Sequence, residues 1–217
     1  MNTIPQNIQN IKSQIGESCT LVAVSKTYPA ETIIQAYNAG QRVFGENRVQ
    51  ELLSKKDLLP NDIQWHLIGH LQSNKIKYII DFVSLIHSVD SEKLLQAIDK
   101  EAAKINRVVP CLLQMYIADE DTKFGLDETE LYHILDNLDQ YKHIQIAGLM
   151  GMATNTSDQE KIKSEFKFLS ELYHKVQSKY FSNNPNFQHL SMGMSSDYKL
   201  AVACGSNMIR VGSLIFG

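Results

Sequence analysis

The sequence predicts an α/β fold, a single (β/α)8 barrel of the TIM type that spans residues 1–217. Three observations favour it. Eight apolar runs of strand length alternate with helical patterns, no glycine-rich dinucleotide turn follows the first run, and 217 residues suffice for one barrel. A doubly wound sheet would show the same alternation, but eight is the number of strands that closes a barrel. We expect no second domain, because one barrel uses the whole sequence.

The expected strands are nearly continuous apolar runs, which is typical of a parallel sheet buried on both faces. They lie at residues 21–26, 42–45, 65–69, 83–87, 108–115, 144–150, 189–192 and 208–211.

Helix-end signals separate these runs. Pro29 and Gly40 bracket an expected helix at 31–39, while Asp90 and Asp127 are expected N-caps of the helices that follow them. The chain stops at Gly217, directly after the last expected strand, so no eighth helix is expected there. The helical segment 4–15 could cover that side of the barrel instead.

The longest expected helix follows Ser157 and Glu160, which have the spacing of a capping box. Its apolar residues fall on one face, as a helix packed on a sheet requires. They are Ile162, Phe166, Leu169 and Tyr173.

Composition excludes several classes of protein. The net charge of −3 and the pI near 6.2 argue against a nucleic-acid partner. No basic, apolar leader opens the sequence and no run approaches about 18 apolar residues, so we expect neither secretion nor membrane insertion. Cys19, Cys111 and Cys204 are isolated from one another, which suits a reducing cytoplasm better than disulfides or zinc.

Lys26 ends the first expected strand, between Ser25 and Thr27. The catalytic end of a barrel is built from residues at this position of each strand. A partly desolvated amine there can form a Schiff base, although a lone strand-end lysine is more often a surface residue at the barrel mouth.

A second group of polar residues ends the sequence. Ser195 and Ser196 precede a helical stretch, and Arg210, Gly212 and Ser213 end the eighth expected strand. Phosphate sites in barrels commonly follow strands seven and eight, and glycine permits close approach to the backbone. Two ordinary turns and a stabilising arginine explain the pattern equally well. Together with Lys26, however, such a cradle would suit a phosphorylated aldehyde.

Other polar and sulfur-containing residues follow the strand ends. Most are expected at the mouth of the barrel, although His66 and His70 are also read as ordinary structural histidines and the methionines as packing residues. The acidic run 119–121 is expected to be a solvated loop, and Gly125 a turn. The candidates are Asn47, His66, His70, Gln72, Asn74, Tyr116, Asp119, Glu120, Asp121, Lys123, Phe124, Met150, Met152, Met192 and Met194.

Several motifs resemble one family in order along the chain. These are AVSKTYP, FGENRVQE, HLIGHLQSNK, GLMGMA, LSMGMSSD and GSNMIRVGSLIFG. They are similar to motifs of the pyridoxal phosphate homeostasis proteins, and the resemblance runs from about residue 5 to 217. It implies the fold of the N-terminal barrel of alanine racemase.

The resemblance also implies a cofactor site for pyridoxal 5′-phosphate (PLP). Lys26 would form the Schiff base, and Ser195, Gly212 and Ser213 would bind the phosphate. Arg210 would face the pyridine nitrogen. Asn47 and Met194 would line the cofactor.

The sequence departs from the family pattern at a few positions. Asn207 ends a motif that usually reads GST, and Ser213 replaces a threonine. Tyr116 stands where asparagine is common and Lys199 where an acidic residue is common. The sequence also stops a few residues early, which leaves closure of the barrel open at this point.

The resemblance implies a carrier that buffers PLP and delivers it to apo-enzymes, without established catalysis. Arginine does not give up its proton, so a ring nitrogen facing Arg210 would stay unprotonated and the ring would be a poor electron sink. Alanine racemase takes a second base, a tyrosine, from a C-terminal domain that is not expected here. A racemase and a phosphosugar aldolase that uses Lys26 without PLP stay as alternatives. We expect a monomer.

Overall fold

The computed structural model describes residues 3–120 and 124–217. Within them, eight parallel strands close into a barrel in the order β1 to β8. The strands are β1 (Thr20–Val24), β2 (Val43–Glu46), β3 (Gln64–Leu67), β4 (Leu85–Val89), β5 (Val109–Met115), β6 (Ile144–Gly151), β7 (His189–Ser191) and β8 (Met208–Val211). The predicted barrel is therefore confirmed, with every strand within a few residues of its expected bounds.

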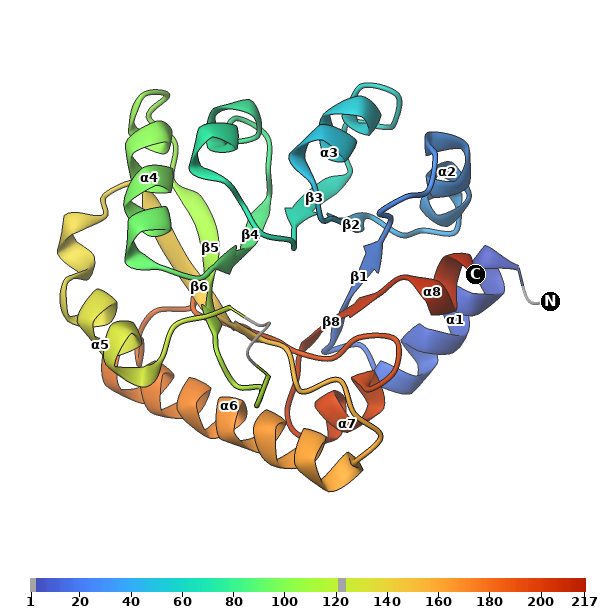
Figure 1. Ribbon diagram of the computed structural model, residues 1–217. Helices are drawn as coiled ribbons and strands as arrows, with labels where there is room; N and C mark the ends of the chain where they lie inside the picture. The colour runs from blue at the N-terminus through green and yellow to red at the C-terminus, as the bar shows by residue number, and fades with distance from the viewer. Residues whose placement is uncertain (1–2, 121–123) are drawn as a thin grey trace.

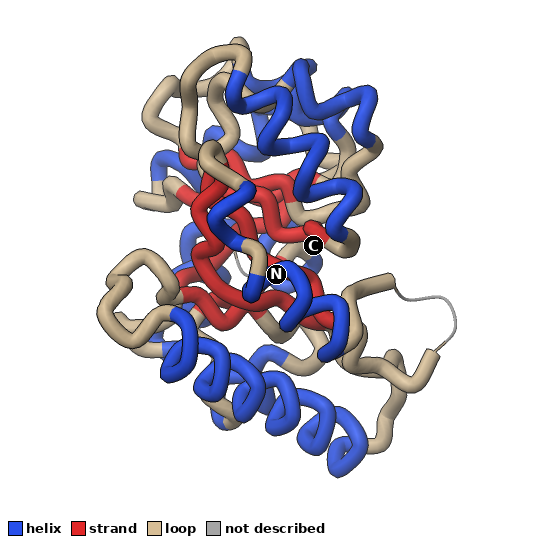
Figure 2. The backbone as a smooth tube through the Cα atoms, turned by 90° about the vertical axis from the view of Figure 1, so that its left-hand side faces the viewer, coloured by secondary structure: helices blue, strands red, loops and turns tan. Residues whose placement is uncertain are grey.

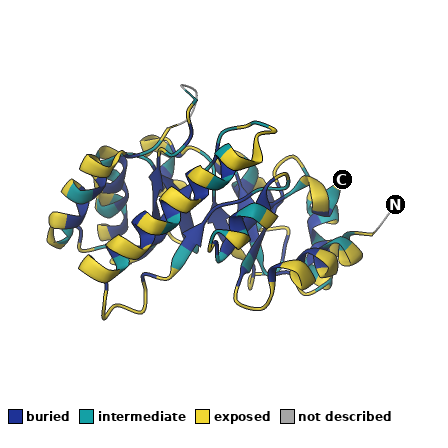
Figure 3. Ribbon diagram, turned by 90° about the horizontal axis from the view of Figure 1, so that it is seen from below, coloured by how far each residue is buried: buried dark blue, intermediate teal, exposed yellow. Residues whose placement is uncertain are grey.

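Helices surround this barrel (Figures 1 and 2). They are α1 (Ile4–Ile15), α2 (Ala30–Asn38), α3 (Val49–Lys56), α4 (Glu92–Ala103), α5 (Glu128–Asp136), α6 (Gln159–Tyr180), α7 (Tyr198–Ala203) and α8 (Ser213–Phe216), with the 3-10 turns η1 (Ser73–Tyr78) and η2 (Leu138–Gln140). The larger core lies between strands and helices, and the outer helix faces are exposed (Figure 3).

The barrel closes between the first and last strands. Thr20 pairs with Met208 and Ala23 with Val211, in parallel register. The barrel is therefore closed by β1 and β8, which settles the closure that the sequence left open.

Helix α1 lies beside the closure seam, where segment 4–15 was expected as a possible cover. It buries Ile8, Ile11 and Ile15 and packs against α2, α7 and α8. The Asn7 side chain donates to the carbonyl oxygen of Ile215. The expectation that no helix follows the last strand was wrong, because α8 forms one helical turn beside α1 (Figure 1).

Two expected helix starts are shifted by one residue. The N-cap of α4 is Ser91 rather than Asp90, whose carboxylate turns to His70 instead. The N-cap of α6 is Asp158 rather than Ser157, because its carboxylate accepts from two backbone N–H groups. The expected start of α5 at Asp127 is confirmed as a capping box with Glu130. The apolar face expected for α6 is buried as predicted.

The three cysteines are free. Among the described residues, no helix combines the length and the apolar character that a membrane span needs.

Candidate functional site

A cavity of about 690 Å³ opens at the carboxyl ends of the strands. This volume is within the range of small-molecule sites. It contains all seven residues expected at a cofactor site, namely Lys26, Asn47, Met194, Ser195, Arg210, Gly212 and Ser213. The remaining lining residues are Val24, Ile68, Gly69, His70, Asp90, Gln114, Phe124, Met152 and Ser196.

The backbone on the N-terminal side of Lys26 is fixed by a buried ion pair. Ser25 Oγ donates to Glu46 Oε1 over 2.7 Å, and Lys55 Nζ donates to the same oxygen over 2.8 Å. Lys55 Nζ also donates to the carbonyl oxygen of Ser25 over 2.9 Å. The end of β2 and helix α3 therefore hold the residue directly before Lys26.

Glu46 is fully buried, and its second oxygen, Oε2, has no hydrogen-bond partner among the described residues. Burial raises the pKa of Glu46, and the hydrogen bonds from Lys55 and Ser25 oppose that shift. The ammonium of Lys55 thus offsets the cost of burying this carboxylate.

The backbone after Lys26 is held from the same helix. Thr27 adopts a positive φ of 69°, which is uncommon for a residue with a side chain. Its N–H donates to Glu51 Oε2 over 2.8 Å. This hydrogen bond lowers the pKa of Glu51.

The Lys26 side chain itself is exposed at the cavity. This exposure matches the alternative stated for a strand-end lysine, a surface residue at the barrel mouth. The physical reason is that the cavity opens to solvent at the barrel mouth, so burial in this region falls on Ser25 and Glu46 instead.

The loops after β7 and β8 meet beside Lys26. The Gly212 N–H points to Ser195 Oγ at 3.4 Å. A Cβ on Gly212 would lie 3.0 Å from the carbonyl oxygen of Val24, so glycine allows the end of β8 to approach β1 closely. Ser195, Gly212 and Ser213 from these two loops therefore line the same cavity as Lys26.

Arg210 is buried in the barrel interior at the base of the cavity. Its Nη1 donates to the carbonyl oxygen and Oγ of Ser191, and its Nη2 donates to the carbonyl oxygen of Gly151. Burial lowers the pKa of Arg210 to about 10, and Asp197 opposes the shift. A guanidinium has five N–H groups, so Nε and one Nη2 hydrogen are left without a partner among the described residues.

The other residues expected at the barrel mouth lie in three different places. His70 lines the cavity, and its Nδ1 lies 3.1 Å from Asp90 Oδ2. Gln72 and Asn74 line a smaller neighbouring hollow. His66 lies inside the barrel, bonded to another histidine, which matches the structural alternative.

The methionines are also divided. Met152 and Met194 line the cavity, whereas Met150 packs inside the barrel and Met192 in the outer core.

The loop after β5 is largely structural. The Tyr116 hydroxyl donates to the carbonyl oxygen of Glu120, and Asp119 pairs with Lys161. Phe124 reaches the cavity. Asp121 and Lys123 lie outside the described residues, and the residues that are described contain no cluster able to hold a metal ion.

Asp90 and Gln114 were missed by sequence reasoning as lining residues. Gln114 is a polar residue within the apolar run of β5, and its amide donates to the carbonyl oxygen of Phe124. A polar residue near the carboxyl end of a buried strand was the available signal.

Comparison with known proteins shows which family has this sequence and this fold. The family model of the alanine racemase N-terminal domain matches residues 1–217. The pyridoxal phosphate homeostasis protein of Aquifex aeolicus is 39% identical over 93% of this chain and 88% of its own length. The pyridoxal phosphate homeostasis protein of Schizosaccharomyces pombe is 38% identical over 100% of this chain and 93% of its own length.

Solved structures agree. PipY of Synechococcus elongatus, 39% identical, superposes with a TM-score of 0.92 without PLP and 0.89 with PLP bound, over 99% of this chain and 100% of that one. Alanine racemase from Bartonella henselae shares the fold at 18% identity, with a TM-score of 0.73. The superposed region spans 96% of this chain and 56% of the racemase chain. The chain therefore belongs to the family of pyridoxal phosphate homeostasis proteins.

Proposed function

We propose that this protein binds PLP as a Schiff base on Lys26 and serves in PLP homeostasis, buffering the cofactor and delivering it to apo-enzymes. The observation that supports this most is the single cavity that joins the Lys26 amine, the donors at Ser195 and Gly212, and the buried guanidinium of Arg210. PipY, a relative with 39% identity, has been solved with PLP bound, and the curated relatives bear the homeostasis name.

The residues present fit the cofactor group by group. A primary amine suits the aldehyde, while hydroxyl and backbone N–H donors at Ser195, Gly212 and Ser213 suit the phosphate. Arg210 has two N–H groups to offer a ring nitrogen. Asn47 and Met194 would line the remaining faces. PLP supplies a reactive aldehyde and a conjugated ring, and the protein supplies position and charge.

The carrier role is supported by the charge of Arg210. A guanidinium keeps its proton, so it stabilises an unprotonated ring nitrogen and weakens the ring as an electron sink. The cavity lining, as far as the structure describes it, includes His70 but no tyrosine. We further propose a cytoplasmic monomer, since free cysteines suit a reducing compartment.

Absorbance spectroscopy with borohydride trapping tests the proposal. The purified protein, incubated with PLP, should show a visible band that borohydride removes, and the reduced adduct should map to Lys26 by mass spectrometry. Lys26→Ala should lose both signals, whereas Lys175→Ala, on the exposed surface of α6, should keep them.

Three further outcomes separate the alternatives. A colourless protein after PLP addition would favour an aldolase that uses Lys26 directly. Turnover of D- or L-alanine that Lys26→Ala abolishes would establish a racemase and overturn the carrier role. Direct delivery would be supported if the PLP-loaded protein activates an apo-PLP enzyme faster than the same amount of free PLP does.

A further inference from the structure

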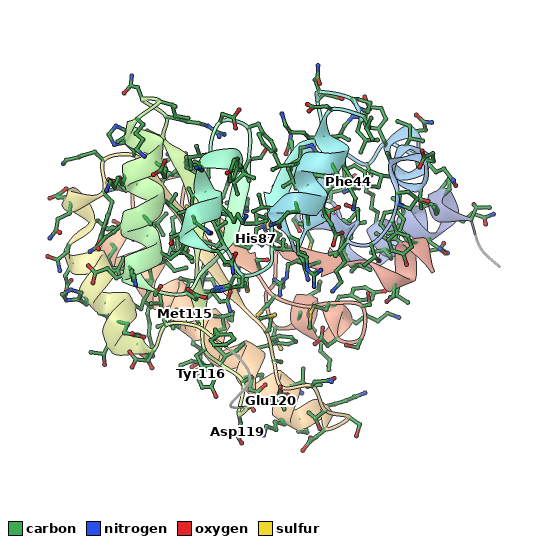
Figure 4. All side chains as sticks on the ribbon, turned by 45° about the horizontal axis from the view of Figure 1, so that its top comes forward. Phe44, His87, Met115, Tyr116, Asp119 and Glu120 are labelled. Carbon is green, nitrogen blue, oxygen red and sulfur yellow. The ribbon has the colours of Figure 1, made fainter. Side chains whose placement is uncertain are left out.

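The interior of the barrel holds a polar layer that the proposed function does not use in full. Met208 on β8 and Leu85 on β4 belong to an apolar cluster that fills the interior. Arg210 and His87 stand two residues further along these strands. Since side chains alternate along a strand, they point to the same interior, one layer nearer the cavity. Figure 4 shows His87 near the middle of the molecule, away from the loop of Tyr116 and Asp119.

Four side chains of this layer form a continuous hydrogen-bonded chain. Arg210 Nη1 donates to Ser191 Oγ over 2.8 Å. Ser191 Oγ lies 3.2 Å from His87 Nδ1, and His87 Nε2 lies 2.9 Å from His66 Nδ1. All four residues are buried, with at most 5% of their surface exposed.

The guanidinium fixes the direction of every bond in this chain. Arginine only donates, so Ser191 Oγ accepts from Arg210. The Ser191 hydroxyl proton then needs an acceptor, and the other atom that Ser191 Oγ contacts is His87 Nδ1. Ser191 therefore donates its proton to His87 Nδ1. If His87 donated instead, the buried hydroxyl proton would have no acceptor among the described residues, which is costly.

The same logic sets both histidine tautomers. With Nδ1 accepting, a neutral His87 carries its proton on Nε2 and donates to His66 Nδ1, so His66 also carries its proton on Nε2. Neutral rings agree with the surroundings, because burial lowers the pKa of His66 to about 3 and lowers that of His87 strongly. A charged ring here would also repel Arg210.

We propose that His87 is a positioning residue, which acts through Ser191 to hold the Arg210 guanidinium toward the ring of the bound cofactor, with His66 fixing the His87 tautomer. This inference rests on the proposed function for the contact between Arg210 and the ring. The acceptors that contact Arg210 are the neutral Ser191 hydroxyl and the carbonyl oxygens of Ser191 and Gly151, while Asp197 acts on the guanidinium through its charge. Oriented neutral acceptors therefore set its position.

The first test needs no cofactor. Long-range ¹H–¹⁵N NMR of the apoprotein at pH 7 should show His66 and His87 as neutral rings with the proton on Nε2. Ser191→Ala, which removes one buried atom, should change the His87 signals and leave the exposed His174 unchanged. A proton on Nδ1 of His87, or a charged ring, would overturn the chain as assigned.

The second test measures cofactor binding by titration of the visible band. His87→Phe and Ser191→Ala should each raise the Kd for PLP about tenfold and shift the band, as expected for one lost buried hydrogen bond. His87→Gln, whose amide oxygen can accept from Ser191, should recover most of the affinity and the band position. Met150→Leu, in the apolar cluster, is the matched control and should leave both unchanged.

The outcomes separate this inference from the proposed function. If the unaltered protein binds PLP and the Ser191 and His87 variants bind it equally well with the same band, the positioning role is wrong and the carrier role stands. If the unaltered protein binds no PLP, both are wrong, while the NMR result still decides the tautomers. Circular dichroism shows whether each variant folds. If His87→Phe does not fold, the PLP affinity of Ser191→Ala decides whether the positioning role is correct.

Discussion

Lys55 Nζ lies 2.8 Å from Glu46 Oε1 and also bonds the carbonyl oxygen of Ser25, the residue before Lys26. Both side chains are buried, and α3 is thereby linked to the ends of β1 and β2. The ion pair thus lies directly behind the lysine that we propose as the cofactor anchor, and its geometry fixes that strand end.

Removing one partner of this pair should be strongly destabilising. Lys55→Met leaves the Glu46 carboxylate buried without a cation, which should cost about 3–5 kcal/mol in the free energy of unfolding. The double variant Lys55→Met, Glu46→Gln should cost clearly less, because a neutral amide can still accept from Ser25. Urea denaturation of the unaltered protein, Lys55→Met, Glu46→Gln and the double variant gives the coupling energy. Additive costs would contradict a coupled pair.

Glu51 should make stability depend on pH in the acid range. Its folded pKa is lowered by the Thr27 N–H from the ordinary 4.5, so the hydrogen bond stabilises the folded state above the unfolded pKa. Glu51→Gln should therefore cost about 1 kcal/mol at pH 7. The difference from the unaltered protein should shrink as pH falls below about 4.5, through the folded pKa. A difference that is constant with pH would assign the loss to packing.

The fold could be predicted because each strand is a local signal. The runs around Val22, Leu112 and Ile209 are apolar on both faces, and a parallel barrel is the structure that buries both. Helix ends were less certain, since Asp90 and Ser91 both suit an N-cap. The choice depended on His70, which lies 20 residues away in sequence and attracts the Asp90 carboxylate.

The site could be predicted where its residues end strands or follow them. Lys26, Ser195 and Gly212 are at such positions. The groups behind them could not, because they depend on which strands are neighbours. The contact between His66 and His87 joins β3 to β4, and Ser191 reaches His87 across the barrel interior. No local pattern in the sequence records that pairing.

Gly148 marks a close approach of two strands. It has a φ of 151°, and a Cβ there would lie 1.8 Å from the carbonyl oxygen of His189. Gly148→Ala should force β6 and β7 apart, cost about 3 kcal/mol or more, and lower Tm by roughly 6–12 °C. Gly40→Ala is a matched control, since its φ is also positive but its Cβ would meet open space. It should cost only about 1 kcal/mol. Equal shifts in Tm would show that backbone strain alone decides both.

The Ser195 hydroxyl should act on the phosphate of the cofactor and on little else. Ser195→Ala removes the hydroxyl whose oxygen accepts from the Gly212 N–H over 3.4 Å and whose proton can go to the phosphate, so the Kd for PLP should rise about tenfold, which corresponds to about 1.4 kcal/mol. Pyridoxal, which has the same aldehyde and ring without the phosphate, should bind Lys26 equally well in both proteins. Isothermal titration of both ligands gives the difference directly. Ser157→Ala, on the surface before α6, should change neither affinity. If pyridoxal binding fell as much as PLP binding, the hydroxyl would be shaping the cavity as a whole, because loss of a phosphate contact cannot weaken a ligand that lacks the phosphate.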